Sequence, residues 1–250
     1  MIASHLSYLR LVADLAESSI SVLFRRSSVS FSEVMAQIRA IGVGAIPTTV
    51  LISITAGYVL ALVLVLQLSQ IGKADIVPSM LWIILTEQVV PVGVALVFTG
   101  RSVSAVTAEL GAMQISEEIK ALFTMGIDVV PFLLLPRLIG FQLMLPAVTV
   151  ISIYASLFGG WLLCGSVLKM SLDGYVYYAM NGARFSSVLI AIVKSALFAF
   201  LIATIAFYKG LNVRNGSHEI SQATTQSVVT GVVVVTMANA IVTTFQLITR

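Results

Sequence analysis

The sequence predicts an all-α integral membrane protein whose main part is a single five-span membrane domain. Of its 250 residues, 58% are hydrophobic and only 10% are charged, whereas soluble domains carry about 25% charged residues. Five apolar runs are each long enough for a membrane helix, which needs about 20 residues. The most polar part of the chain, residues 101–137, separates the second run from the third. We therefore expect several membrane spans joined by short polar segments.

The first 44 residues are expected to form interfacial amphipathic helices. Apolar residues recur at alternating steps of four and three over residues 2–23, and the charged residues fall on the opposite face. A second apolar face covers residues 31–41 and follows Ser30 and Glu33, which have the spacing of a capping box. Such faces suit a helix lying in the membrane surface, with ordinary packing as the alternative. We divide the chain into interfacial helices over 1–44 and a membrane domain over 45–250.

The spans are placed at residues 45–68, 80–99, 138–164, 185–207 and 225–248. Lysines and arginines then gather on one side of the membrane. That side holds Arg10, Arg25, Arg26, Arg39, Arg101, Lys120, Arg137, Lys209 and Arg214, and the other holds Lys73, Lys169, Arg184 and Arg250. The positively charged side faces the cytoplasm. This predicts a cytoplasmic N-terminus, an external C-terminus and a cytoplasmic position for residues 101–137.

A short amphipathic helix is expected within residues 101–137. Ser116 can cap it, carboxylates follow in the first turn, and Gly126 supplies a stop. Its apolar residues Ile115, Ile119, Leu122 and Phe123 fall on one face. Two interpretations remain open for this helix. It can lie on the lipid headgroups, or it can be a docking helix for a soluble partner that acts on the membrane domain.

The same residues carry a family resemblance. The pattern G-R-x-x-x-A-x-x-A-E-L-G-x-M, followed by E-I-x-A-L-x-x-M-G-I-D and then P-R, resembles the MlaE/YrbE family of ABC transporter permeases that work with MCE-domain proteins. It consists here of Gly100, Arg101, Ala105, Ala108, Glu109, Leu110, Gly111, Met113, Glu118, Ile119, Ala121, Leu122, Met125, Gly126, Ile127, Asp128, Pro136 and Arg137. The resemblance extends over nearly the whole chain. Residues 45–250 would then be a permease domain, with a coupling segment at 100–137.

The resemblance implies that the cytoplasmic coupling helix between the second and third spans meets an ATPase subunit. The implied coupling residues are Arg101, Glu109, Glu117, Glu118, Ile119, Leu122, Phe123, Met125, Asp128 and Arg137. Ala223, Thr224 and Thr225 resemble the family's A-T-T sequence before the last span. They are either a second cytoplasmic contact or hydroxyl-rich capping residues at a helix start.

The partners and the substrate also follow from the resemblance alone. It implies a homodimer in the bacterial inner membrane, with a periplasmic C-terminus, two ABC ATPase subunits, MCE-domain periplasmic subunits and a small STAS-type accessory protein. The implied substrate is phospholipid or a similar amphiphile. No cofactor is expected on this chain, because ATP and Mg²⁺ would be bound by the partner ATPase.

Two charged residues lie within the predicted spans, Glu87 in the second and Lys194 in the fourth. Charges inside a membrane are costly and usually face a partner or an aqueous cavity. Both lie roughly 10–14 Å from the outer end of their span, at 1.5 Å per residue. Either they pair or line the substrate path together, or Lys194 extends outward and Glu87 is hydrated. The family often has R-E-L-G-P where this chain has the sequence E-Q-V-V-P, which begins at Glu87.

No catalytic, metal-binding or nucleic-acid-binding site is expected. Gly72 and Lys73 lack the upstream glycine of a phosphate-binding loop, and His5 and His218 form no ligand cluster. A basic run with interleaved aromatic residues is also missing from the sequence. We therefore predict a non-enzymatic membrane subunit. The alternative is a secondary transporter or channel for a hydrophobic solute that is not coupled to an ATPase.

Overall fold

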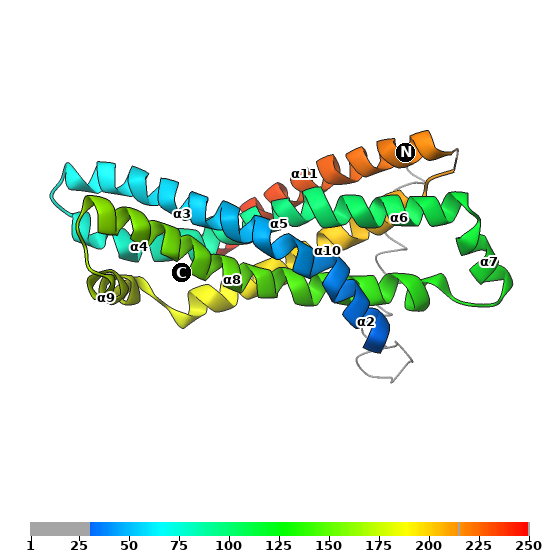
Figure 1. Cartoon of the computed structure of the whole chain (residues 1–250), viewed down its shortest axis with the longest axis horizontal. Coiled ribbons are helices and arrows are strands. Elements are labelled where there is room, and N and C mark those ends of the chain that lie inside the picture. The colour runs from blue at the N-terminus through cyan, green and yellow to red at the C-terminus, as the bar shows by residue number, and fades with distance from the viewer. Residues whose placement is uncertain (1–30, 215, 250) are drawn as a thin grey trace. The chain divides into compact units, whose positions relative to one another are not determined.

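The computed structural model of the protein describes residues 31–214 and 216–249, and each secondary-structure element in these ranges is a helix (Figure 1). The interfacial helix expected over residues 2–23 lies outside the described residues. The α-helices are α2 (Phe31–Gln37), α3 (Ile46–Ser69), α4 (Val77–Ile84), α5 (Val90–Phe98), α6 (Ser104–Ile115), α7 (Glu118–Thr124), α8 (Leu135–Val167), α9 (Leu172–Gly182), α10 (Phe185–Leu211) and α11 (Ser217–Thr249). Four π-helical turns lie at Ile38–Gly42, Leu85–Val89, Thr99–Val103 and Val130–Leu134, and two 3₁₀ turns at Val43–Ala45 and Ala74–Ile76.

Five continuous helical segments of the described residues are long and apolar enough to cross a membrane, which confirms the predicted number of spans. They are Ser32–Ser69, Ala74–Ile115, Val130–Val167, Phe185–Leu211 and Ser217–Ile248. Each predicted span lies within one of these segments, but the helices are longer than the spans. The second runs to Ile115, so part of the expected polar loop is helical. Alanine, glutamate and leucine in residues 104–115 are good helix formers, and no proline interrupts them.

The chain forms two compact units, which we describe separately. Among the described residues, the first unit lies within the ranges 31–44, 98–144 and 198–235, and the second within 45–97, 145–197 and 236–249. Helices α8, α10 and α11 each contribute residues to both units.

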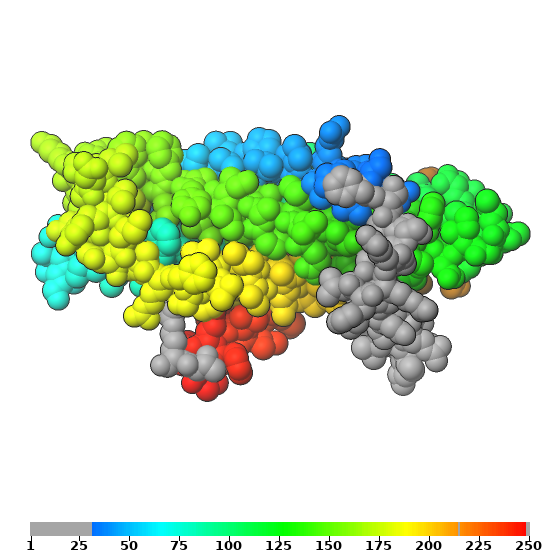
Figure 2. Space-filling view, turned by 90° about the horizontal axis from the view of Figure 1, so that it is seen from below, coloured from blue at the N-terminus to red at the C-terminus, as the bar shows by residue number. Residues whose placement is uncertain are grey.

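In the second unit, α3 and α8 lie side by side and pack through glycines (Figures 1 and 2). A Cβ atom on Gly57 of α3 would overlap the carbonyl oxygen of Ser156, and one on Gly159 of α8 would overlap that of Ile54. Small residues allow membrane helices to approach closely, because little hydrophobic force acts between helices within lipid. The glycines therefore set the distance between these two spans.

A helix that the sequence did not predict, α9, lies between the third and fourth spans. Its N-cap Ser171 accepts a hydrogen bond from the backbone N–H of Gly174 at 3.2 Å. It packs on α4, where Ser79 donates a hydrogen bond to the Tyr178 carbonyl. Tyr175 is buried and donates to the Leu157 carbonyl at 3.0 Å. The sequence analysis predicted no helix between the third and fourth spans, so the packing role of Tyr175 is a finding of the structure.

In the first unit, the chain departs from α-helical geometry at residues 38–44, between α2 and α3. Ser102 donates a hydrogen bond to the Ile41 carbonyl at 2.9 Å, and the Arg101 guanidinium donates to the Gly44 carbonyl. Distorted helical turns leave carbonyl groups without their usual partners. The two side chains of the Thr99–Val103 turn satisfy such carbonyls and hold this segment.

Candidate functional site

Helix α7 is the short piece that connects α6 to the start of the third spanning helix (Figure 1). It ends as the sequence predicts: Gly126 has φ +73°, its N–H donates to the Phe123 carbonyl at 3.1 Å, and the Ile127 N–H donates to the Leu122 carbonyl at 3.0 Å. These two bonds form a Schellman motif, which favours glycine at the left-handed position. We call residues 104–137 the coupling hairpin.

The start of α7 differs from the prediction. Ser116 closes α6 instead of capping α7, and its hydroxyl donates to Glu118 Oε1 at 2.9 Å. Glu117 occupies the N-cap position with φ 59°. Its carboxylate forms an exposed ion pair with Lys120 at 3.3 Å, and such pairs contribute little to stability. The chain therefore reverses direction at Glu117, whose backbone is in the left-handed conformation. The capping pattern in the sequence did not predict this turn.

An ion pair links the two long arms of the coupling hairpin. Nη2 of Arg137, at the start of α8, lies 2.6 Å from Oε1 of Glu109 in α6. Nη1 of the same guanidinium donates to the Leu133 carbonyl at 2.9 Å. Arg137 is buried, whereas the Glu109 side chain is half exposed. A buried guanidinium requires a partner, so this pair fixes the spacing of the two arms that carry α7.

The structure separates the ten predicted coupling residues into two groups. Arg101, Glu109, Arg137 and Ile119 serve contacts within the chain, and Ile119 is buried under α7. Glu117, Glu118 and Asp128 are exposed and Leu122 is half-buried. Phe123 is 64% exposed and Met125 is 71% exposed. An exposed phenylalanine beside an exposed methionine forms an apolar surface, and exposed apolar patches commonly mark interaction sites.

The predicted second contact lies inside α11, which begins at Ser217, so these residues do not cap the helix start. Ala223 is buried, and the hydroxyl of Thr224 donates to the Ile220 carbonyl at 2.7 Å. The hydroxyl of the exposed Thr225 donates to the Ser221 carbonyl at 3.0 Å. Thr225 therefore has an exposed side chain on the same unit as the coupling hairpin.

A buried polar cluster in the second unit brings the two intramembrane charges together. Nζ of Lys194 in α10 donates to the Glu87 main-chain carbonyl and to Gln88 Oε1, each at 3.1 Å, and to Thr243 Oγ1 at 3.2 Å. Oε1 of Glu87 accepts a hydrogen bond from Ser187 at 2.7 Å. Glu87 and Lys194 are both buried. We call these five residues the polar cluster.

The π-helical turn Leu85–Val89 makes this arrangement possible. It carries Glu87 and Gln88, and π turns occur frequently at functional sites. The main-chain carbonyl of Glu87 thus accepts a hydrogen bond from Lys194 of α10. Proximity of Glu87 and Lys194 was one of the two interpretations that their depth and opposite charge left open. The sequence analysis did not identify Gln88, Ser187 and Thr243, although the E-Q pair at a position where the family often has R-E was a usable signal.

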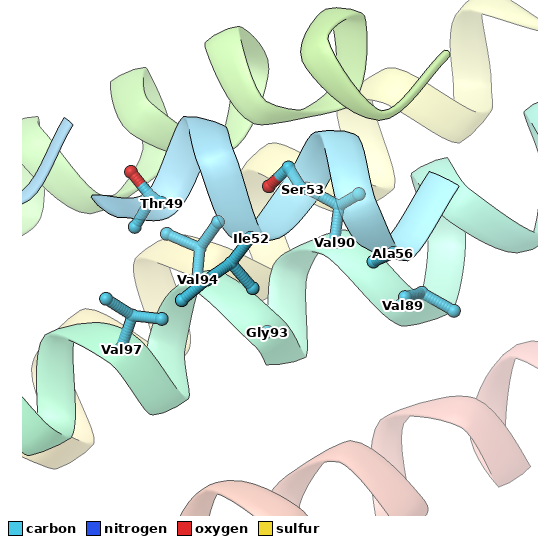
Figure 3. Close-up of a pocket in the computed structure, with 9 residues that line it drawn as sticks. All are labelled: Thr49, Ile52, Ser53, Ala56, Val89, Val90, Gly93, Val94 and Val97. Carbon is cyan, nitrogen blue, oxygen red and sulfur yellow. The ribbon is translucent and has the colours of Figure 1, made fainter. Parts of the chain in front are cut away.

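A small notch lies beside this turn, between α3 and α5 (Figure 3). Its volume is about 40 Å³, and valine is the most frequent residue of its lining, which also contains Ala56 and Gly93. The hydroxyl of Thr49 in this lining donates to the Ala45 carbonyl at 2.8 Å. The second unit therefore places an apolar surface directly after the turn that carries the polar cluster.

Comparisons with known proteins agree with this architecture. The family model described as "Permease MlaE" matches residues 34–245. A probable ABC transporter permease protein of Synechocystis is 30% identical over 190 residues, covering 74% of this chain and 72% of its own length. A probable ABC transporter permease protein of Rickettsia typhi is 26% identical, and the alignment covers 85% of this chain and 82% of that protein. The chloroplastic protein TRIGALACTOSYLDIACYLGLYCEROL 1 of Arabidopsis thaliana is 25% identical and covers 88% and 63%.

The family match extends over most of the chain, and the relatives named as ABC permeases align over most of their own length. The match includes both the coupling hairpin and the polar cluster. An ABC permease is the membrane-spanning part of its transporter, and its name implies an ATPase partner. This multi-pass membrane protein belongs to the MlaE permease family and is a permease subunit of an ABC transporter.

Proposed function

We propose that this subunit moves phospholipids or similar amphiphiles between the inner membrane and the outer envelope of a bacterium. It would act as a homodimer, with ATP and Mg²⁺ bound by separate ATPase subunits and with MCE-domain subunits on the periplasmic side. A STAS-type protein is a further accessory partner. The carrying observation is the coupling hairpin, whose two arms are held by the Arg137–Glu109 pair while α7 exposes Phe123 and Met125.

The exposed tip of α7 suits an ATPase groove. Aromatic and methionine side chains are enriched in the cores of protein interfaces, and a few such anchors carry most of the binding energy. Because Ile119 is buried against its own chain, a force on the tip would be transmitted to α6 and α8. Their ion pair would then make the two arms move together.

A lipid substrate is supported by two observations. The apolar surface beside the Leu85–Val89 turn can face acyl chains. The Arabidopsis relative carries a name that contains that of a diacylglycerol lipid.

Affinity purification from a native bacterial membrane tests both parts of this proposal. The wild-type complex should retain an ATPase, and lipid extraction should recover phospholipid bound to it. Phe123→Asp together with Met125→Asp should release the ATPase, because a buried carboxylate has no partner in an apolar groove. The matched control is Tyr177→Asp. Tyr177 is 66% exposed and lies on α9, outside the coupling hairpin, so this variant should retain the ATPase.

The outcomes separate the alternatives. An ATPase that stays bound to the double variant would show that α7 is only a surface anchor. A wild-type protein that purifies without any ATPase would favour the alternative of an uncoupled transporter or channel. A complete complex that yields no lipid would contradict the substrate class and leave the coupling role intact.

A further inference from the structure

A polar pocket lies in the first unit, between the end of α10 and the start of α11. It has a volume of about 250 Å³, and its lining includes Tyr208, Lys209, Asn212, Glu219, Gln222 and Gln226. We call it the α10–α11 pocket. The lining also includes Ala223 of the predicted second cytoplasmic contact, but the six polar side chains belong neither to the α7 surface nor to the polar cluster. Most of them can donate hydrogen bonds, and one is a cation.

Lys209 is the cation of this pocket. It lies in the last turn of α10 and is half-buried, and its Nζ donates to Gln226 Oε1 at 3.0 Å. The ion pairs found among the described residues, Lys120–Glu117 and Arg137–Glu109, do not include it. The carboxylate of Glu219 accepts a hydrogen bond from the Arg214 backbone N–H at 2.9 Å. The Lys209 ammonium, held by a neutral amide, retains its attraction for an anion, and the Glu219 carboxylate in the same lining reduces that attraction.

The depth of the pocket indicates the source of that anion. Lys209 follows the apolar part of the fourth span by two residues, and Tyr208 precedes it. Tyrosines concentrate where a membrane meets water, and the positive-inside rule assigns this end of α10 to the cytoplasm. At that level the common anion is the phosphate of a lipid headgroup. Basic pockets between membrane helices on the cytoplasmic side bind such headgroups.

We propose that the α10–α11 pocket binds the phosphate group of a phospholipid from the cytoplasmic leaflet. Lys209 provides the charge, and the amide groups of Asn212 and Gln222 provide further donors. The site is distinct in sequence and composition from the polar cluster, and it requires only that the protein spans the membrane with this end of α10 on the cytoplasmic side. It can therefore hold a lipid whether or not phospholipid is the transported substrate.

Native mass spectrometry of the full-length, delipidated protein titrated with phosphatidylglycerol tests this site. The wild-type protein should bind phosphatidylglycerol, and Lys209→Gln should lower the affinity about fivefold. This is the effect of one basic residue near an anionic surface. Gln226→Glu should weaken binding similarly, because the new carboxylate would neutralise Lys209 while keeping its hydrogen bond. Lys120→Gln removes the same charge on the same side of the membrane, from exposed α7, and should leave the affinity unchanged.

Three results would overturn the proposal. Equal affinities in wild-type, Lys209→Gln and Gln226→Glu proteins would exclude the pocket as the lipid site. An equal loss in Lys120→Gln would indicate general surface attraction. Inorganic phosphate that binds at low concentration and protects Lys209 from acylation, where phosphatidylglycerol vesicles do not, would indicate a soluble anion. Thermal unfolding of each variant verifies that the folded protein is being compared, and an ATPase pull-down tests the proposed function separately.

Discussion

Single residues hold the polar cluster together, and Lys194 contacts more of its members than any other. Its ammonium donates to Glu87, Gln88 and Thr243, which come from two different helical segments. Burial makes each of these bonds important, because an acceptor left without a donor loses its hydration as well as its partner. The carboxylate of Glu87 bonds to Ser187 and also supplies charge opposite to that of the lysine.

Replacing Lys194 by methionine should lower the stability of the protein by about 1–3 kcal/mol, since it leaves buried acceptors unsatisfied. Glu87→Gln keeps an oxygen for Ser187 but removes the negative charge near Lys194. The double variant should therefore be less damaged than the sum of the single variants, with a coupling energy of about 0.5–3 kcal/mol. Thermal unfolding in one detergent measures all four proteins. Strictly additive losses would mean that the two charges act independently.

The Arg137–Glu109 pair is the corresponding contact in the coupling hairpin. Glu109→Gln leaves the buried guanidinium with a neutral partner, and the exposure of Glu109 reduces the cost through solvent screening. We expect a modest loss of stability, below about 1 kcal/mol, but a clear loss of ATP-driven transport with the ATPase still bound. Proteoliposome assays of transport, combined with a pull-down, make this comparison. Normal transport would show that the pair has only a structural role.

At the scale of elements, glycines determine where a helix ends and how closely two helices pack. Gly126 ends α7 in the left-handed region, and Gly57 allows α3 to contact α8. A Cβ atom at Gly126 meets no neighbour, so the cost of a side chain there is conformational. A Cβ atom at Gly57 would overlap a backbone oxygen, so the cost there is steric.

Gly57→Ala should destabilise the protein by about 1–3 kcal/mol, the usual range for overpacking. Gly93→Ala is the control, because a Cβ atom there has no neighbour within 4 Å. The control should be neutral or stabilising, since alanine favours a helix over glycine. Denaturation of the purified proteins would show the difference. Equal stabilities of the Gly57→Ala and Gly93→Ala proteins would contradict the prediction, because α3 and α8 would then move apart without a cost in free energy.

For the whole molecule, the predicted orientation places α7 in the cytoplasm and α9 in the periplasm. The single cysteine, Cys164, is buried, so it interferes little with labelling. Cysteines at Met125 and Tyr177 replace residues with similar exposure, 71% and 66%. An impermeant maleimide added to intact spheroplasts should label the Tyr177→Cys protein, and the Met125→Cys protein only after lysis. The reverse result would invert the orientation.

The fold class and the number of spans could be predicted from hydropathy alone, because hydropathy is a property of consecutive residues and needs no information about distant ones. It also predicted the stop of α7 at Gly126, since that motif is local. It missed α9, and it placed Ser116 in the wrong helix, because capping residues can serve the end of one helix or the start of the next.

The packing of the helices was needed to show which polar residues act together. Gln88 and Thr243 are 155 residues apart and share a hydrogen bond, and Glu109 reaches Arg137 across the coupling hairpin. It also showed that Ile119 belongs to the interior while Phe123 and Met125 stay exposed. The physical reason is that a buried charge or apolar side chain is stabilised by whichever partners the packing of helices brings to it, and that packing depends on residues far apart in the chain.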